Sequence, residues 1–263
     1  MVEPVTDAPF PLPALHPVLE AVRRDAATGR LAHWGASTLI DEHTGVPSID
    51  AELFETLHRA AGLDAAFPNG HAGLLHVYGY WYSTVPTPYG YKRDRWHDGT
   101  LARAYGLPAD AFHLDAPQAG PPGSGRPGSG APSSGAPGSD LEPTLLARVT
   151  GAALPVLRRP PAGSLVADAV VDGRLSRVVL QHGPGAETPA LVYGIEPSGS
   201  DAGAATGTGG IGTGTGSAAP PGSAPASDRL VLLTTFPFSG DPAPLLEEFV
   251  REPVLRWNAV SHS

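Results

Sequence analysis

The chain has 263 residues, a formal net charge of −9 and no cysteine. The lack of cysteine excludes disulfides, thiolate metal sites and cysteine nucleophiles. A negative chain without a basic block is also a poor candidate for binding nucleic acid or an anionic membrane surface. No apolar run approaches the roughly 18 residues of a membrane-spanning helix, and the N-terminus lacks the basic and apolar regions of a secretory signal, so we expect a soluble, cytoplasmic protein.

Two low-complexity tracts rich in glycine interrupt the chain, at residues 117–139 and 197–227. Neither offers enough apolar surface to offset the entropy lost on ordering, so we predict that both are disordered insertions. The other residues suffice for one compact core, and we expect a single domain over residues 1–263. Because the second tract separates two predicted strands, we interpret it as a long hairpin loop.

Helices dominate the predicted N-terminal half. Apolar residues at helical spacing predict a helix over residues 14–28. Asp50 is a typical N-cap for a second helix, which Gly62 ends. A third, short helix should carry Leu101 and Tyr105.

One strand is predicted within this helical half. Residues 74–83 are rich in aromatic and β-branched side chains, which favour β structure. Alternation along that strand would place four side chains on one face, namely His76, Tyr78, Tyr80 and Tyr82.

The C-terminal half changes to antiparallel β structure after a helix over residues 141–157, which Pro155 bends or ends. The pair Asp172-Gly173 is typical of a type I′ hairpin turn. A meander of strands is therefore predicted, over residues 164–171, 174–181, 190–195 and 229–236. A closing helix starts at Asp241, and the complete pattern indicates an α+β fold.

Lys92 is the only lysine of the chain, beside sixteen arginines. It lies in residues 76–97, which contain five of the seven tyrosines and two of the four tryptophans. A lysine among such rings can be desolvated and can then act as a base, a nucleophile or an anion anchor. The segment therefore predicts a small-molecule site, although a half-buried strand face beside a solvated loop would give the same pattern.

The predicted catalytic residues are Lys92, as general base or Schiff-base nucleophile, and His76, which would move protons. Arg93 or Arg95 would hold a substrate carboxylate through paired hydrogen bonds. The aromatic lining of the substrate site is predicted to comprise Tyr78, Tyr80, Tyr82, Tyr89, Tyr91 and Trp96.

Histidines suggest a second kind of site, because a mononuclear metal needs three converging ligands. The candidates are His33, His43, His71, His76 and His97, with Asp41 and Glu42 as possible partners. Their spacing matches no known metal pattern, so we predict no metal, and the sequence demands no other cofactor.

Four segments carry a resemblance to known proteins: residues 71–84 (HAGLLHVYGYWYST), 88–96 (PYGYKRDRW), 233–238 (LTTFPF) and 255–260 (LRWNAV). Together they resemble a poorly described group of actinobacterial proteins that are often labelled amino acid deaminase. The resemblance implies an activity on amino acids but transfers no catalytic residue.

These observations favour a small-molecule enzyme that acts on an amino acid or a related amine, by deamination or C–N hydrolysis. A non-catalytic protein that binds a small ligand in the same aromatic pocket is the alternative. A factor that binds RNA through its aromatic rings is a third possibility, which the negative charge disfavours. The sequence leaves the substrate and the oligomeric state open.

Overall fold

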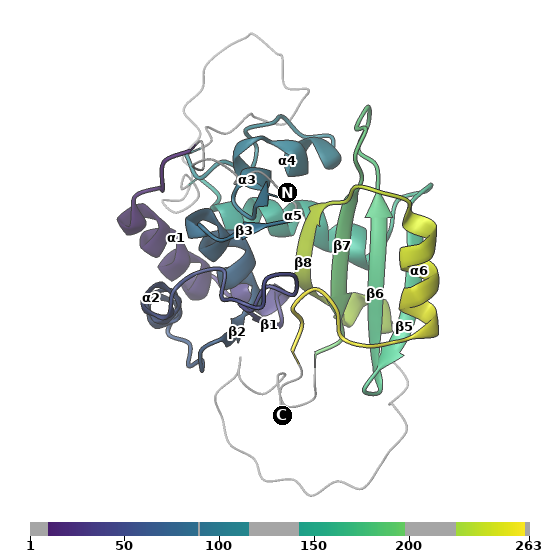
Figure 1. The fold of residues 1–263 in the computed structure, drawn as a ribbon, viewed down its shortest axis with the longest axis horizontal. Helices are drawn as coiled ribbons and strands as arrows, with labels where there is room; N and C mark the ends of the chain where they lie inside the picture. The colour runs from purple at the N-terminus through teal and green to yellow at the C-terminus, as the bar shows by residue number, and fades with distance from the viewer. Residues whose placement is uncertain (1–9, 89, 116–141, 198–224, 261–263) are drawn as a thin grey trace, which may run out of the picture.

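The computed structural model describes residues 10–88, 90–115, 142–197 and 225–260 (Figure 1). The first low-complexity tract lies outside these ranges, as does the second apart from its ends. Ala226 and Ser227, at the end of the second tract, belong to a short 3-10 helix, η5 (Ala226–Arg229). The predicted disorder of residues 117–139 and 198–224 thus falls outside the described part of the chain, whereas at residues 226–227 the prediction is wrong.

The first two predicted helices are confirmed, as α1 (Leu15–Ala27) and α2 (Ala51–Ala61). The Asp50 side chain caps α2 by accepting a hydrogen bond from the Leu53 amide, and Gly62 ends it at a φ of 69°. The third appears as α4 (Thr100–Ala104). Shorter elements lie between them: η1 (Arg30–His33), β1 (Ala36–Thr38), β2 (Asn69–His71), β3 (Pro86–Thr87), β4 (Gly90–Tyr91) and α3 (Asp94–His97).

The predicted aromatic strand is wrong. Residues 73–82 form a π-helix, η2 (Gly73–Tyr78), followed directly by a 3-10 helix, η3 (Gly79–Tyr82). The segment is buried on nearly all sides, and a short run that is apolar all round fits a buried helix as well as a strand. Its two glycines lie close to packed side chains, Gly73 against Trp34 and Gly79 against Ile49, so tertiary packing overrides the local β preference.

The predicted meander is confirmed as a four-stranded antiparallel sheet in the order β5-β6-β7-β8. Its strands are β5 (Leu165–Val171), β6 (Arg174–Gln181), β7 (Ala190–Ile195) and β8 (Val231–Pro237). Asp172 and Gly173 both have positive φ, 51° and 74°, as a type I′ turn requires.

Helices cover both faces of this sheet (Figure 1). One is α5 (Leu145–Arg158), and the other is the closing helix α6 (Pro242–Arg251). Helix α5 continues for three residues beyond Pro155. On β7, Gly194 abuts Leu157 of α5, while the neighbouring Tyr193 packs against Phe249 of α6. Consecutive strand residues point to opposite faces, so α5 and α6 lie on opposite sides.

The long helix α5 joins the two halves of the fold, because it contacts β6, β7 and β8 as well as α1, η1 and η2. The buried apolar residues of both halves form one connected core. The C-terminal tail returns to the N-terminal half, where Ala259 pairs with Ser37 of β1. In the described ranges, no helix has the length and apolarity needed to cross a membrane.

Candidate functional site

A cavity of about 560 Å³ lies where β8 and the C-terminal tail meet the helical half. Its walls come from the turn after β1, the η2–η3 segment, the stretch from β4 to α4, the end of β8, and the tail. Five of the predicted site residues line it: His76, Tyr80, Tyr91, Lys92 and Arg95.

Lys92 is buried, with 8% of its surface exposed, which confirms its expected desolvation. Its Nζ lies 3.0 Å from Oδ2 of Asp41 and donates a hydrogen bond to the Tyr80 hydroxyl at 3.2 Å. The same ammonium lies 4.5 Å from the centre of the Tyr80 ring. A Schiff-base nucleophile must be an uncharged amine, so this ion pair favours an electrostatic role for Lys92 over a nucleophilic one.

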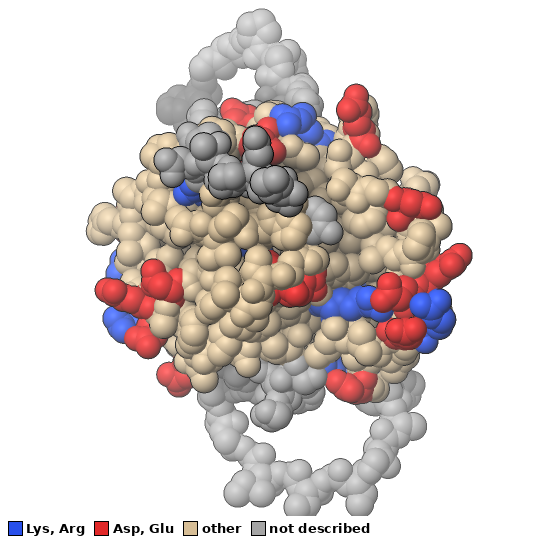
Figure 2. Space-filling view, viewed as in Figure 1, with Lys and Arg blue, Asp and Glu red and all other residues tan. Residues whose placement is uncertain are grey.

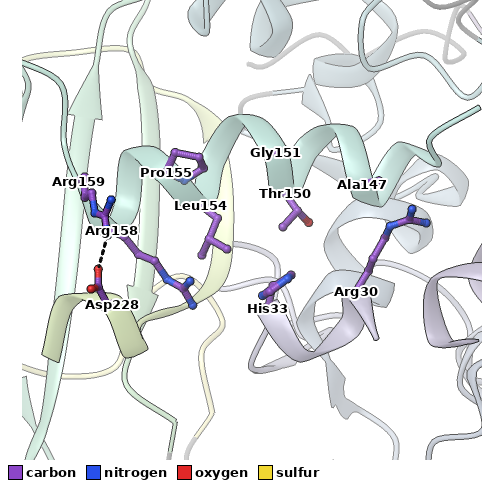
Figure 3. Close-up of a pocket in the computed structure, with 10 residues that line it drawn as sticks. All are labelled: Arg30, His33, Ala147, Thr150, Gly151, Leu154, Pro155, Arg158, Arg159 and Asp228. Atoms are coloured by element: carbon purple, nitrogen blue, oxygen red, sulfur yellow. Dashed lines mark ion pairs between the residues drawn. The ribbon is translucent and has the colours of Figure 1, made fainter. Parts of the chain in front are cut away.

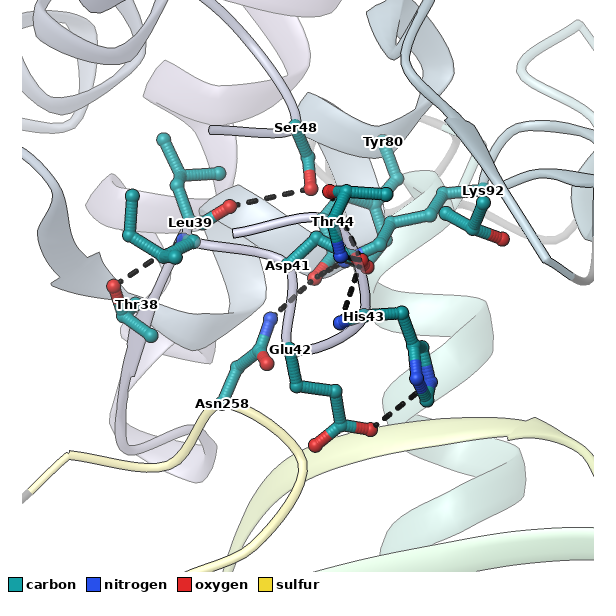
Figure 4. Close-up of polar contacts among 12 residues, drawn as sticks. Thr38, Leu39, Asp41, Glu42, His43, Thr44, Ser48, Tyr80, Lys92 and Asn258 are labelled. Carbon is teal, nitrogen blue, oxygen red and sulfur yellow. Dashed lines mark hydrogen bonds and ion pairs between the residues drawn. The ribbon is translucent and has the colours of Figure 1, made fainter. Parts of the chain in front are cut away.

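Asp41 is held by a turn of its own (Figure 4). Its Oδ1 accepts hydrogen bonds from the backbone amides of His43 and Thr44, at 3.0 and 2.9 Å, and from the Thr44 hydroxyl. Burial by itself raises the pKa of Asp41, but the hydrogen bond and charge of Lys92, with the two amides, lower that pKa below its usual value. The carboxylate is therefore a fixed anion that orients Lys92.

Tyr80 is the meeting point of the site, because three side chains converge on it. Its hydroxyl accepts from Lys92 and, at 3.5 Å, from the Asn258 amide, while the His76 ring stacks on its ring at a centroid distance of 4.8 Å. His76 and Tyr80 are four residues apart, which places them on the same side of the helical segment. A strand would also have placed these two side chains on one face, because strand side chains alternate and residues four apart point the same way.

His76 is almost fully buried and hydrogen-bonded to Ser37, whose Oγ lies 2.8 Å from its Nε2. The Ser37 hydroxyl also donates to the backbone oxygen of Asn258 at 2.8 Å. Burial, and then the charges of Lys92 and Arg95, lower the pKa of His76 well below its usual value, while the Leu233 backbone opposes this. The imidazole is therefore neutral near pH 7.

Arg95 carries the second positive charge at the cavity. Its Nε donates to the backbone oxygen of Lys92 at 3.0 Å, which holds the guanidinium above the Tyr80 ring and near that of Phe236. The remaining guanidinium donors suit a carboxylate or another planar anion.

Four other predicted site residues do not line the cavity. Tyr78 donates its hydroxyl hydrogen to buried Asp25, and Tyr82 donates to the Ala14 backbone. Arg93 is buried with its guanidinium over the Tyr91 ring, and Trp96 is a core residue that stacks on Trp81. The prediction of one common face fails because a helical backbone turns Tyr78 and Tyr82 away from His76 and Tyr80. Tyr89 lies outside the described residues.

The C-terminal tail supplies residues that the sequence did not assign to the site. Trp257 and Asn258 both have positive φ, 49° and 66°, in the left-handed region that bulky residues rarely adopt. This turn is held because the Asn258 backbone oxygen accepts from the Thr38 amide at 2.7 Å. It presents Trp257 and the Asn258 side chain to the cavity. Such strain is typical of functional turns, and it gives no signal in the sequence.

The candidate metal ligands do not converge. Among the described residues, no group of three or more histidines and carboxylates could hold a metal ion. His71 instead contacts the Leu31 backbone, and His33 lines a different cavity.

Comparisons with protein-family models, with curated proteins and with solved structures found no match to this chain. The resemblance to the group labelled amino acid deaminase therefore stays a hypothesis, and the function has to be argued from the site.

Proposed function

We propose that this cavity is the active site of a small-molecule enzyme that acts on an amino acid or a related amine, by deamination or C–N hydrolysis. The observation that carries the proposal is the convergence of the Lys92 ammonium on the Tyr80 hydroxyl at one wall of a cavity of ligand size. Perturbed and paired polar groups in a concave site favour a catalytic use.

Both charges of a zwitterionic substrate find partners in the lining. Arg95 is placed to hold a carboxylate, while Asp94 and Asp98 are carboxylates that can face an amine. Two aromatic side chains of the lining, Phe236 and Trp257, would enclose the apolar part.

Tyr80 is the proposed proton donor. In C–N hydrolysis water adds to carbon, the C–N bond breaks with its electron pair on nitrogen, and the leaving amine takes a proton. The Tyr80 hydroxyl would deliver that proton and regain one from the attacking water. Lys92, at 3.2 Å, would stabilise negative charge that develops on the Tyr80 oxygen, and Asp41 would position Lys92.

The distribution of charged side chains on the surface bears on the class of substrate. On the face shown in Figure 2, basic side chains lie beside acidic ones and form no broad basic area. That pattern suits a small-molecule substrate better than a nucleic acid. We further propose that the protein works in the cytoplasm, because a chain without cysteine suits a reducing compartment.

The proposal is tested by incubating the protein with amino acids, their amides and simple amines while ammonia release is measured. Tyr80→Phe should lower kcat by roughly 10²- to 10⁴-fold, the usual contribution of a positioned acid or base. Tyr82→Phe is the matched control, because its hydroxyl lies away from the cavity, and it should leave kcat unchanged. Equal losses in both variants would contradict the role of Tyr80.

A non-catalytic binding protein is the second candidate, and the ion-paired state of Lys92 favours it. A ligand that binds to the wild type without turnover, and more weakly to an Arg95→Gln variant, would support binding over catalysis.

A further inference from the structure

A second cavity, of about 540 Å³, lies between η1, α5 and η5 (Figure 3). It shares no lining residue with the Lys92 cavity. Its charged lining consists of three arginines and one aspartate, Arg30, Arg158, Arg159 and Asp228. Two of these arginines already have carboxylate partners: Arg30 lies 3.2 Å from buried Asp25, and Arg159 lies 3.6 Å from Asp228. Arg158 therefore supplies the positive charge that a ligand in this cavity can use.

Hydrogen-bond donors dominate the polar lining. Arg158 uses its Nε to reach the Leu230 backbone oxygen at 3.0 Å, which fixes the side chain and leaves its two terminal amino groups for other acceptors. Thr150 accepts from the indole of Trp34 at 2.8 Å, so its hydroxyl proton is available to an acceptor in the cavity. Figure 3 shows Arg158 and Thr150 approaching His33 from two sides.

The one carboxylate in the lining is already engaged, since Asp228 lies 3.6 Å from the Arg159 guanidinium. Burial, and then the charge of Arg158, lower the pKa of His33, so its imidazole adds a further N–H donor without a charge at pH 7. The complement to this set of donors is a ligand group that is rich in acceptors and negatively charged.

Apolar surface forms the remaining wall, from Ala147, Leu154 and Pro155 of α5. Between them, the exposed Gly151 leaves an open hollow at the rim of the cavity, because a Cβ atom placed on it would meet no other atom within 4 Å. An inorganic ion would leave this apolar wall exposed to water, whereas a ligand with an apolar body would bury it.

We propose that this cavity is a second ligand site, which binds a small organic anion: a carboxylate or phosphate group attached to a compact apolar body. The anionic group would lie between Arg158, His33 and Thr150, and the apolar body would fill the hollow above Gly151. This site is independent of the proposed catalytic site.

Calorimetric titration of the full chain with benzoate, phenyl phosphate and inorganic phosphate tests the proposal. One or both aromatic anions should bind, and inorganic phosphate should bind at least about tenfold more weakly because it cannot cover the apolar wall. Equal affinity for inorganic phosphate and phenyl phosphate, or no binding by either aromatic anion, would overturn it.

Two substitutions locate the binding. Arg158→Gln removes a fixed charge and should weaken the aromatic anions by at least about tenfold, since a charge-assisted hydrogen bond contributes that much or more. Gly151→Leu keeps every charge but fills the hollow, so it should abolish binding, whereas Gly151→Ala should retain it. Arg159→Gln, at an 82% exposed side chain, serves as the charge variant if Arg158→Gln does not fold.

Arg251→Gln is the matched control, because Arg251 is an exposed arginine on α6, outside the cavity lining. It should bind the aromatic anions like the wild type. Unchanged binding by both Gly151→Leu and the arginine variant of the cavity would place the ligand elsewhere and refute the site.

Discussion

Lys92 and Asp41 form a buried ion pair between residues that are far apart in the chain, with 9% and 4% of their side chains exposed. The density of aromatic residues around Lys92 allowed its burial to be predicted from the sequence. Its partner was not predictable, because only the tertiary fold brings the turn after β1 to the start of α3. The available signal was local: an aspartate followed by His43 and Thr44 is typical of a side chain that caps its own turn.

Substitution of either partner should destabilise the protein strongly. Lys92→Met leaves the Asp41 carboxylate buried without its counter-charge, and Asp41→Asn does the same to Lys92, so each should cost about 3–5 kcal/mol of unfolding free energy. The double variant should lose less than the sum of the two. Urea denaturation measures all three, with Arg59→Met, at an exposed pair with Glu55, as a control of small effect. Additive losses would show that the two charges are not coupled.

The elements were predictable where a local rule decides them and not where packing does. The β5–β6 hairpin follows from the turn preference of Asp172 and Gly173, and α2 follows from its two caps. The segment from Gly73 to Tyr82 carries strand-forming residues, yet it is helical because it fills the interior between α2, α5 and β8. Whether this segment is a helix or a strand decides which tyrosines reach the cavity. The wrong prediction of a strand therefore also assigned Tyr78 and Tyr82 wrongly to the cavity lining.

Two glycines in neighbouring elements should respond in opposite ways to alanine. Gly194→Ala on β7 would push a methyl group into the Leu157 side chain and the Val231 backbone oxygen, and should destabilise the protein by about 1–3 kcal/mol. Gly151→Ala on α5 meets open space in a helix, and should stabilise it by up to about 1 kcal/mol. Thermal unfolding compares the two, and a stabilising Gly194→Ala would contradict the close contact between α5 and the sheet.

The whole molecule buries several histidines in neutral form. The pKa values of His33, His58, His76 and His97 are all lowered from 6.5, in each case mainly by burial. At His58 the reason is visible in its contacts, since Nδ1 faces the Phe54 carbonyl and Nε2 accepts from the His71 amide. A second proton would destroy the latter hydrogen bond. None of this could be predicted without knowing which histidines the fold encloses.

Mild acid should therefore destabilise the fold. Because the folded-state pKa of these histidines lies below the unfolded value of 6.5, the unfolded chain binds more protons, and stability falls as the pH drops below 6.5. The loss is at most about 1.4 kcal/mol per pH unit for each fully buried histidine. The melting temperature should fall between pH 7.5 and 5, and His58→Gln should reduce that slope. A flat profile over this interval would mean that the histidines are accessible to protons in the folded state.

The turn at Trp257 also gives the cavity an optical signal. Of the four tryptophans, Trp34, Trp81 and Trp96 are buried in the core, whereas Trp257 lines the cavity beside Tyr193, at a ring distance of 4.8 Å. Indole emission depends on the polarity around the ring, so filling of the cavity would displace water from this one fluorophore. The protein thus carries a reporter through which compounds can be screened for entry before any reaction is known.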